Sequence, residues 1–279
     1  MNKVTACLDG ASYTKSVCDY AIWAARRLDA PLEFLHVLIR QSDVAVDASG
    51  SIGLGAQESL LQELADLDER RSIIAREHGN QLLDGARQFA LQAGIPKVST
   101  HQRHGELTDT LVALEAETRL YVLGQHDSAT KPKRFLLDHN LESAVRTLHR
   151  PILVANSTFT EPRRCMIAFD ASETGRKMID MVAESPLLRG IECQIVTVGS
   201  AAQDALQWAS EKLAAAGLKA TAHQLDGEPA AALANHARQH GMEIIVMGAY
   251  GHSRIRHLIV GSTTTTILRE SQVPVLVLR

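Results

Sequence analysis

Several features that mark specialised classes of protein are scarce in this sequence. Phe, Trp and Tyr together make up only 4% of the 279 residues, and the formal net charge is −3. Base-stacking surfaces need aromatic side chains, and binding to nucleic acid or anionic membranes needs a basic excess, so we expect neither partner. The four cysteines include no CxxC pair, and Cys7, Cys165 and Cys193 lie in apolar runs. Free buried thiols in a reducing cytoplasm are therefore expected.

Segments that direct a chain to or across a membrane are also missing. The first residues, KVTACL, are typical of a strand and lack the basic, apolar and small regions of a leader. No apolar stretch reaches the roughly 18 residues that a membrane span needs. The hydrophobic content of 45% and the charged content of 22% are those of a globular protein, and the length fits two domains.

Blocks of sequence occur twice in the same order, which indicates a duplicated domain. VTACLDGAS returns as CMIAFDASE, a match that pairs Asp9 with Asp170. Further on, RHGELTDTLVALEAETRLYVLG parallels LDGEPAAALANHARQHGMEIIVMG, and LESAVRTLHRPILVA parallels TTTILRESQVPVLVL. We expect one domain over residues 1–157 and a second over 163–279, joined by the polar, proline-containing segment NSTFTEPRR.

Each half alternates short apolar runs with helical patterns. In the second half, strands are expected at 164–169, 193–198, 219–225, 243–248 and 274–279, and helices at 174–188, 201–216, 229–240 and 263–271. This alternation predicts an α/β fold with two tandem doubly wound domains, each a five-stranded parallel sheet, related by a pseudo-twofold axis. The strands read as apolar on both faces, as strands covered by helices on both sides do.

The first half is longer because of an insertion at about 40–76. Its beginning, QSDVAVDASGSIGLG, is typical of a loop, and the following residues 57–94 have the pattern of a long amphipathic helix. Leu60, Leu61, Leu64 and Leu67 keep helical spacing. We expect this helix to pack on the body of the protein or on a partner.

The stretch GAYGHSRIRHLIVGST follows the fourth expected strand of the second half. Open parallel sheets bind ligands at the carboxyl ends of their strands, which is where this stretch lies. Gly248 and Gly251 let backbone N–H groups approach an anion closely. Gly261, Ser262 and Thr263 open the last helix, whose amino terminus offers unpaired N–H donors to a phosphate. The loop between these elements contains His252 and Arg254.

The spacing Gly248-x2-Gly251-x9-Gly261-Ser262 resembles the nucleotide signature of the universal stress protein family, in its ATP-binding branch. The duplicated layout is similar to that of tandem members, whose domains have a Rossmann-like fold of the adenine nucleotide alpha hydrolase type. The resemblance implies an adenine nucleotide, ATP with or without Mg²⁺, held by the second half. It implies that phosphates lie against the glycines and the start of the last helix, that Asp170 lies near the nucleotide, and that the first two strand ends line the base and ribose pocket. The implied site comprises Ala168, Phe169, Asp170, Ala171, Val198, Met247, Gly248, Gly251, His252, Arg254, Gly261, Ser262 and Thr263.

The first half carries a degenerate copy of this signature. Aligning Pro151 with Pro274 puts Asp138 opposite Gly261, and Asp127 stands near the place of the second glycine. Two carboxylates would repel a phosphate and occupy its space. We therefore expect one nucleotide per chain. In the family the final strand commonly pairs with that of another domain, and here the two halves could form this pairing within one chain; a monomer and a homodimer both remain open.

The leading interpretation is a stress-response module that is regulated by ATP and hydrolyses it slowly at most, with an unidentified protein partner. No P-loop lysine, GxSxG elbow or arranged Cys–His pair indicates fast chemistry, and no dedicated zinc site is expected. One alternative is a partner-binding scaffold with a vestigial nucleotide site. Another, a nucleotide-dependent α/β enzyme, is disfavoured because DGAS and DASE replace GxGxxG after the first strands. The glycine stretch as a turn and cap, and Asp170 as a loop carboxylate, are the structural alternatives.

Overall fold

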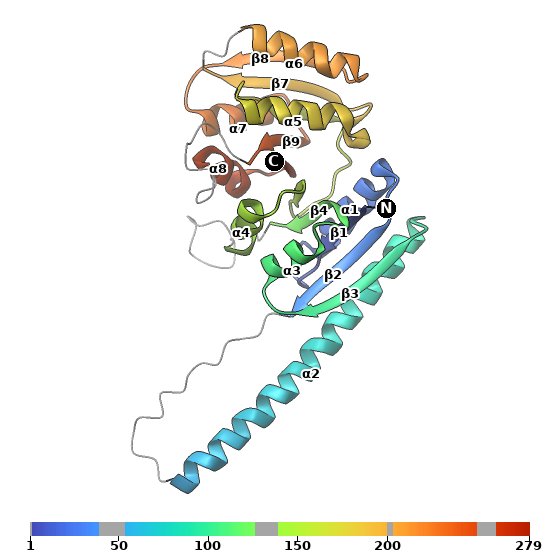
Figure 1. The fold of residues 1–279 in the computed structure, drawn as a ribbon, viewed down its shortest axis with the longest axis vertical. Helices are drawn as coiled ribbons and strands as arrows, with labels where there is room; N and C mark the ends of the chain where they lie inside the picture. Colours follow the sequence, from blue (N-terminus) through green and yellow to red (C-terminus); the bar gives the residue numbers. More distant parts are fainter. Residues whose placement is uncertain (1, 39–53, 126–138, 200–202, 250–260) are drawn as a thin grey trace.

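The computed structural model describes residues 2–38, 54–125, 139–199, 203–249 and 261–279 (Figure 1). The first half of the chain begins with a strand and alternates strands with helices up to residue 155. Its elements are β1 (Lys3–Cys7), α1 (Thr14–Leu28), β2 (Leu32–Leu38), α2 (Leu54–Gln92), β3 (Val98–His104), α3 (Leu107–Leu114), β4 (Thr118–Gly124), α4 (His139–Thr147) and β5 (Ile152–Ala155).

The second half repeats this order without a counterpart of the long α2. Its elements are β6 (Arg164–Ala168), α5 (Glu173–Glu184), η2 (Pro186–Leu188), β7 (Glu192–Val198), α6 (Gln203–Ala215), β8 (Ala220–Leu225), α7 (Pro229–Gln239), β9 (Ile244–Gly248), α8 (Ser262–Glu270) and β10 (Val275–Leu278). The five strands predicted for this half are confirmed to within about two residues at each end.

All ten strands form one sheet in the order β3-β2-β1-β4-β5-β10-β9-β6-β7-β8. Read from its outer edge, each half has the same order, and its strands are parallel. The two halves meet at β5 and β10, which pair antiparallel with Leu153 opposite Leu276. The predicted α/β class with two five-stranded parallel halves is therefore confirmed, and the antiparallel junction is the relation that a pseudo-twofold axis requires.

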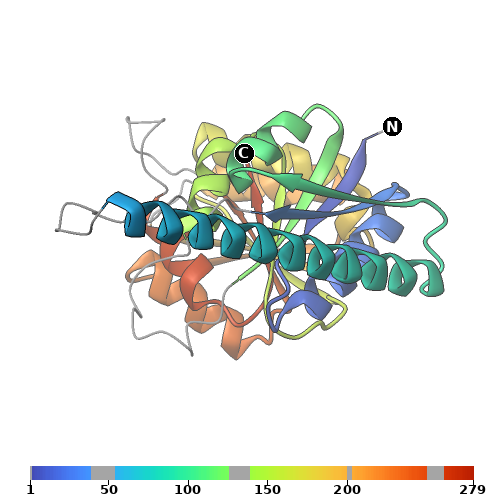
Figure 2. The ribbon, with the colours of Figure 1, turned by 90° about the horizontal axis from the view of Figure 1, so that it is seen from below.

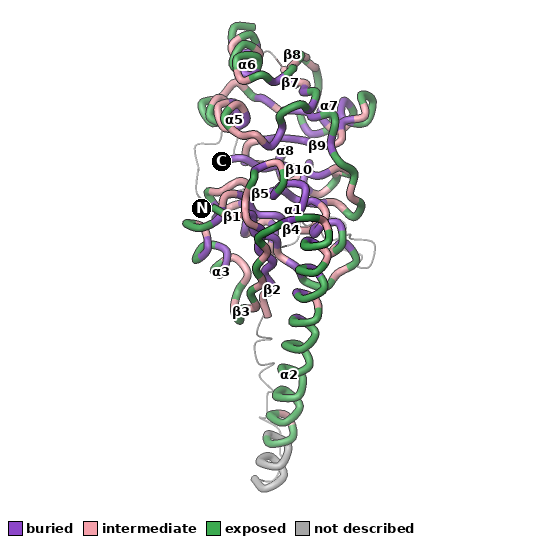
Figure 3. The backbone as a smooth tube through the Cα atoms, turned by 90° about the vertical axis from the view of Figure 1, so that its right-hand side faces the viewer, coloured by how far each residue is buried: buried purple, intermediate pink, exposed green. Residues whose placement is uncertain are grey.

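Helices cover both faces of the sheet and enclose two apolar cores. One core contains side chains from α1, α2, α5 and α6, and the other contains side chains from α3, α4, α7 and α8. The buried residues follow the middle of the molecule in Figure 3. Only the outermost strands differ from the expectation of apolar residues on both faces. β3 and β8 alternate between exposed and half-buried residues because each has a neighbouring strand on one side only.

One predicted helix is shorter than expected. The segment 174–188 ends as an α-helix at Glu184 and continues as a single 3-10 turn, η2. Pro186 has no N–H for the helical ladder and disfavours helical backbone at Ser185, whose ψ is 133°. Pro186 therefore ends the helix, and the sequence prediction did not take it into account.

The predicted insertion helix is confirmed and forms α2, which continues to Gln92. Its carboxyl-terminal part packs on the first half through Leu83, Ala86 and Ala90. Its amino-terminal part extends beyond β3 in Figure 1, and the perpendicular view in Figure 2 also shows it reaching past the body. Within the described residues, no helix is both long and apolar enough to cross a bilayer.

Candidate functional site

The predicted site residues of the second half gather at the carboxyl edge of its strands. Ala168, at the end of β6, lies opposite Val196 of β7 and Met247 of β9. After β6 the chain passes to β7 on one side, whereas β9 lies on the other side. β6 is therefore the point where strand order reverses, which is where doubly wound sheets form their ligand crevice.

Small and apolar side chains line this edge. Ala168, Val198 and Leu225 are partly buried against a core that contains Met247. Phe169 is only 2% exposed and its ring belongs to the core on the opposite face of the sheet. Thr197 Oγ1 donates a hydrogen bond of 2.8 Å to the Phe169 carbonyl, which fixes that backbone. Phe169 can therefore line a pocket only through its main chain, whereas Ala168 and Val198 present apolar side chains.

Asp170 follows β6 and is held by the start of α5. Its Oδ1 accepts hydrogen bonds from the Ser172 N–H at 3.0 Å and from the Ser172 hydroxyl at 2.6 Å. Ser172 in turn caps α5 by accepting from the Gly175 N–H at 3.0 Å. A Cβ at Gly175 would lie 2.5 Å from Asp170 Oδ1, so glycine is needed for this close approach. The carboxylate is exposed but fixed in place, a geometry that serves the loop itself and also suits a ligand.

The residue after Asp170 has unusual backbone geometry. Ala171 has φ of 59°, in the left-handed region. That conformation costs an alanine roughly 1 kcal/mol relative to glycine. Strain of this kind often lies at ligand-binding loops, where it holds main-chain groups in position.

The start of α8 lies beside the end of β9. Thr264 Oγ1 donates a hydrogen bond of 3.3 Å to the Gly248 carbonyl, which joins the two elements. Gly261 occupies the N-cap position and α8 has no side-chain cap. The first N–H groups of α8, at Ser262 and Thr263, therefore carry the partial positive charge of a helix end next to Gly248. This arrangement can bind an anion.

Several predicted site residues fall outside the part of the chain that the structure describes. Gly251, His252 and Arg254 lie in residues 250–260, and the two carboxylates of the degenerate copy, Asp127 and Asp138, lie in residues 126–138. The helix boundaries nevertheless agree with the alignment of the halves. Asp138 precedes α4, which begins at His139, just as Gly261 precedes α8, which begins at Ser262.

The corresponding edge of the first half is filled by a side chain. Tyr13, at the start of α1, is 3% exposed and donates its hydroxyl to Asp9 Oδ2. Its ring lies directly over Gly124, the last residue of β4, because a Cβ at Gly124 would be 2.0 Å from the ring. Asp9 Oδ1 accepts from the Ala11 N–H at 3.0 Å. Asp9 therefore has a structural role, and the space between the two strand ends is occupied.

A cavity that described residues line at this edge, beside Tyr13 and Gly124, has a volume of about 90 Å³. Ligand pockets usually measure about 300–1,000 Å³, so this space holds a few water molecules at most. Cys7 lines it, and burial together with the charges of Asp9 and Glu33 raises the pKa of this thiol. The thiol is therefore neutral at physiological pH and is a poor nucleophile.

Sequence reasoning missed Tyr13. The signal was present, because Tyr13 stands four residues after Asp9 and Thr174 stands four residues after Asp170. A large aromatic residue in the first half and a small hydroxyl residue in the second indicate that less space is left between the strand ends of the first half. The direction of the ring toward Gly124, however, depends on how α1 packs, and the pattern does not show it.

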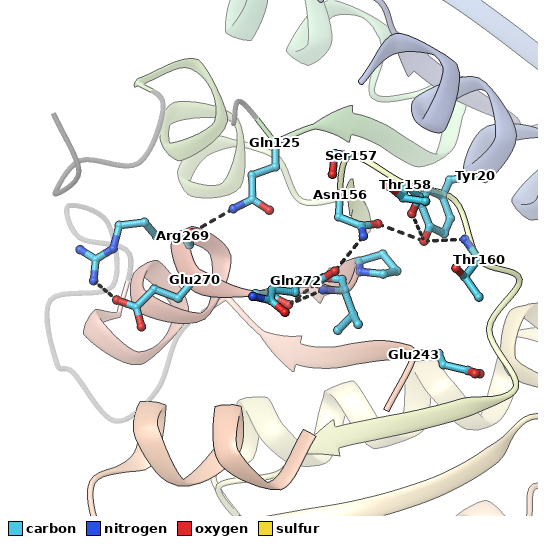
Figure 4. Close-up of a pocket in the computed structure, with 13 residues that line it drawn as sticks. Tyr20, Gln125, Asn156, Ser157, Thr158, Thr160, Glu243, Arg269, Glu270 and Gln272 are labelled. Carbon is cyan, nitrogen blue, oxygen red and sulfur yellow. Dashed lines mark hydrogen bonds and ion pairs between the residues drawn. The ribbon is translucent and has the colours of Figure 1, made fainter. Parts of the chain in front are cut away.

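A larger cavity of about 610 Å³ lies between the halves, near the linker (Figure 4). Its polar groups bond mainly to each other. The Tyr20 hydroxyl donates to Asn156 Oδ1 at 3.1 Å, and the Asn156 amide donates to the Gln272 carbonyl at 2.8 Å. The Gln125 amide donates to the Leu268 carbonyl at 2.6 Å, at the end of α8. The hydrogen bonds around this cavity therefore join the first half and the linker to the second half.

The described residues contain no group of three or more His, Cys, Asp or Glu side chains arranged to hold a metal ion. All four cysteines are free thiols.

The fold and the reversal of strand order at β1 and β6 define a doubly wound α/β protein with two similar halves in one sheet. A family model described as the universal stress protein family matches residues 1–156 and 194–279. Universal stress protein Slr1230 of Synechocystis sp. is 33% identical over 287 residues, with 100% of both chains covered. The chain therefore belongs to the universal stress protein family, as its resemblance indicated.

Solved structures agree on the fold. A universal stress protein from Archaeoglobus fulgidus has a TM-score of 0.72 at 19% identity, covering 100% of this chain and 96% of that chain. A functionally unknown protein from Pseudomonas aeruginosa has a TM-score of 0.64 at 16% identity, covering 100% and 92%. Both similarities extend over the whole duplicated chain, so the tandem arrangement of ten strands is shared.

Proposed function

We propose that the second half binds ATP at its strand-end crevice and that nucleotide occupancy regulates the protein as a stress-response module. The observation that carries the proposal is the junction of β9 and α8. There the Thr264–Gly248 hydrogen bond holds an uncapped helix amino terminus beside a glycine, on the strand next to β6, where strand order reverses. Membership of the universal stress protein family supports this assignment.

The described residues fit the two ends of an adenine nucleotide. Ala168, Val198 and Met247 offer an apolar wall of the kind that suits a base. Gly248, Ser262 and Thr263 offer main-chain N–H groups and hydroxyls to the phosphates. We assign Gly251, His252 and Arg254 to the phosphate side from their sequence positions. One half of the crevice is therefore apolar and the other is suited to negative charge.

Asp170 carries the same sign of charge as a triphosphate. A bound Mg²⁺ ion would supply the positive charge that lets the two approach, since Mg²⁺ prefers carboxylate and phosphate oxygens. Without the ion, the carboxylate would serve as an acceptor for ribose hydroxyl groups. Its two hydrogen bonds from Ser172 favour a positioning role, so we expect hydrolysis to be slow at most and the bound state to be the signal.

We also propose the organisation of the chain around this site. The domains are placed at 1–157 and 163–279, and the β5–β10 pairing takes the place of a pairing between separate subunits. The first half, closed by Tyr13, would then act as a permanent partner for the nucleotide-binding half. Free thiols throughout are consistent with the expected reducing cytoplasm.

The test is to identify nucleotide released from the denatured protein by mass spectrometry and to titrate ATP into the emptied protein. Gly261→Asp should weaken binding about 100-fold or more, because a carboxylate would stand where phosphate belongs. Gly261 has φ of −56° and ψ of 142°, which any residue adopts, and aspartate is a good N-cap, so the variant should fold.

Gly85→Asp is the matched control, since Gly85 lies on α2 with nothing within 4 Å of an added Cβ. ATP binding by Gly261→Asp at wild-type strength would contradict the proposed site. Preferential binding of a nicotinamide cofactor would favour the nucleotide-dependent enzyme instead. Binding of a protein partner with the same affinity in the presence and absence of nucleotide would favour the scaffold function. The exposed apolar residues of α2 are a separate observation in favour of that alternative.

A further inference from the structure

The amino-terminal part of α2 leaves the body of the protein. α2 has 39 residues, which makes it about 58 Å long at 1.5 Å per residue. Among the described residues, its first contact with the strands is a hydrogen bond of 3.2 Å from the Gln102 amide to the Arg76 carbonyl. At Gly79 a Cβ would lie 2.0 Å from the same amide. Before that point every described side chain of residues 62–78 is exposed except Leu64, which is half-buried. Figures 1 and 3 show this part projecting past β3.

This projecting part exposes large apolar side chains. Leu67 is 48% exposed, Ile73 57% and Ile74 68%. Most helical stability in proteins comes from packing of an apolar face. A helix that projects with apolar residues uncovered therefore indicates a surface that another molecule covers.

Four apolar residues and one arginine of α2 follow a heptad pattern. Leu60, Leu64, Leu67, Arg71 and Ile74 are spaced alternately by four and three residues, and together we call them the α2 seam. That spacing is the a and d repeat of a two-helix coiled coil. At roughly 100° per residue, the seam is turned by about 110° from Leu83, Ala86 and Ala90. Its continuation meets the body, because a Cβ at Gly10 would lie 3.1 Å from His78 and 3.9 Å from Leu82. A second helix can therefore lie along the seam only up to the residue before His78. Ile73 lies outside the seam.

Charged residues flank the seam in a way that selects the partner. Glu63 and Arg70 occupy the same heptad position one repeat apart. Neither has an ion-pair partner within the described chain, whereas Asp68 and Arg71 pair with each other at 3.6 Å. One chain thus offers an unpaired acid and an unpaired base at matching positions. We propose that the α2 helices of two copies of this protein pair antiparallel along the α2 seam.

One register satisfies the two central leucine layers and the charged positions, and it sets Arg71 opposite the partner's Leu60 and Ile74 opposite the partner's Gln57. It places Leu64 opposite the partner's Leu67, and by symmetry Leu67 opposite the partner's Leu64. Glu63 then faces the partner's Arg70, and this pair also occurs twice. The same register sets Leu54, the first residue of α2, opposite the partner's Glu77. The overlap therefore ends just before Gly79, so it covers the projecting part and stops where the body begins.

Other arrangements oppose like charges. Shifting the partner by one heptad toward the body sets Glu63 against the partner's Glu77 and Arg70 against the partner's Arg70. A parallel pair sets Arg71 against the partner's Arg71 within the seam, and Glu63 against the partner's Asp68. Like charges facing each other across a helix pair are destabilising. The sequence of charges therefore favours the antiparallel register.

Sedimentation equilibrium of the full-length protein tests the pairing. The apparent mass of the wild type should rise with protein concentration toward twice 30.4 kDa. Leu64→Glu combined with Leu67→Glu should raise the dissociation constant at least about 100-fold, because both central layers are lost. Ile73→Glu is the matched control, an equally exposed apolar residue off the seam, and should leave the mass unchanged. Circular dichroism shows whether each variant folds.

Charge reversal tests the register. Glu63→Arg and Arg70→Glu should each weaken the dimer about tenfold, whereas the double variant should restore it because the pairs are reciprocal. A parallel pair would instead be strengthened by Glu63→Arg, and that outcome would overturn the proposal. A monomeric wild type, a dimer that survives both leucine substitutions, or an equal loss in Ile73→Glu would overturn it as well. ATP binding enters none of these measurements, so the result is independent of the proposed function.

Discussion

The two halves of this protein have the same strand order and differ in what lies between their strand ends. In the first half the ring of Tyr13 covers Gly124 and leaves a cavity of about 90 Å³. In the second half the matching position is Thr174, a small exposed residue bonded to Ser172. A duplicated fold can thus keep its frame and close one site with a single side chain at the start of one helix.

The comparison also separates structural from functional roles of the shared aspartate. Asp9 holds the Tyr13 hydroxyl and the Ala11 N–H, so its carboxylate serves the closed site. Asp170 bonds only to Ser172 among the described residues. The same residue in the same loop therefore holds a tyrosine in one half, whereas in the other it holds only the start of the helix and stays exposed.

The largest effect is expected from copying the tyrosine into the second half. Thr174→Tyr should place a ring over Gly248 and lower the affinity for ATP about 100-fold or more, because the crevice would be filled. Isothermal titration measures the change. Thr174→Ala removes the hydroxyl without filling the space and should bind ATP normally. Unchanged affinity in Thr174→Tyr would mean that the two loops are not equivalent.

The reverse change should cost stability. Tyr13→Thr removes a buried ring and should lower the free energy of unfolding by about 3 kcal/mol, as other large-to-small core substitutions do. Tyr13→Phe loses only the hydrogen bond to Asp9 and should cost about 1–2 kcal/mol. Urea denaturation gives both values. Neither variant should gain a second ATP site, because Asp127 and Asp138 remain; acquisition of one would show that the tyrosine alone blocks binding.

A smaller, opposite pair of effects is expected one residue after each aspartate. Gly10 and Ala171 both have positive φ, 78° and 59°. Ala171→Gly should stabilise the protein by up to about 1 kcal/mol, since glycine adopts this conformation freely. Gly10→Ala should destabilise it by at least as much, because its Cβ would also lie 3.1 Å from His78. Thermal unfolding of the two variants should shift in opposite directions, and a shift in the same direction would refute the shared loop geometry.

The smallest expected effect concerns pH and the second half only. His236 is buried, stacks on His240 at 4.1 Å between ring centroids, and lies 5.3 Å from His223. Burial, and then the charges of His240 and His223, lower its pKa below the ordinary value of 6.5. Protonation therefore favours the unfolded chain. His236 leaves the free energy of unfolding unchanged above about pH 6.5 and lowers it progressively as pH falls below that value.

Urea midpoints measured between pH 7 and pH 5 test this histidine. The first half has Leu114 at the matching position, and His236→Leu should flatten the pH dependence. If the urea midpoint of that variant fell more steeply with decreasing pH, the pH dependence would come from groups other than His236.

Sequence reasoning succeeded where local chemistry decides the structure. β9 was predicted one residue from its observed start because its apolar run is continuous. α7 begins at Pro229, as predicted, directly after the Glu228 cap. It failed where placement depends on packing between distant elements. Neither the ring of Tyr13 over Gly124 nor the Thr264–Gly248 hydrogen bond has a signature in spacing. The helix predicted at 174–188 was too long because the prediction followed the apolar periodicity past Pro186, whereas the α-helix ends at Glu184.

The number of ATP molecules bound per chain tests the difference between the halves most directly. Equilibrium dialysis of the nucleotide-free protein with radiolabelled ATP and Mg²⁺ should give one site in the wild type and none in Gly261→Asp. Two equivalent sites in the wild type, or one site that survives Gly261→Asp, would contradict the account of one open and one closed half.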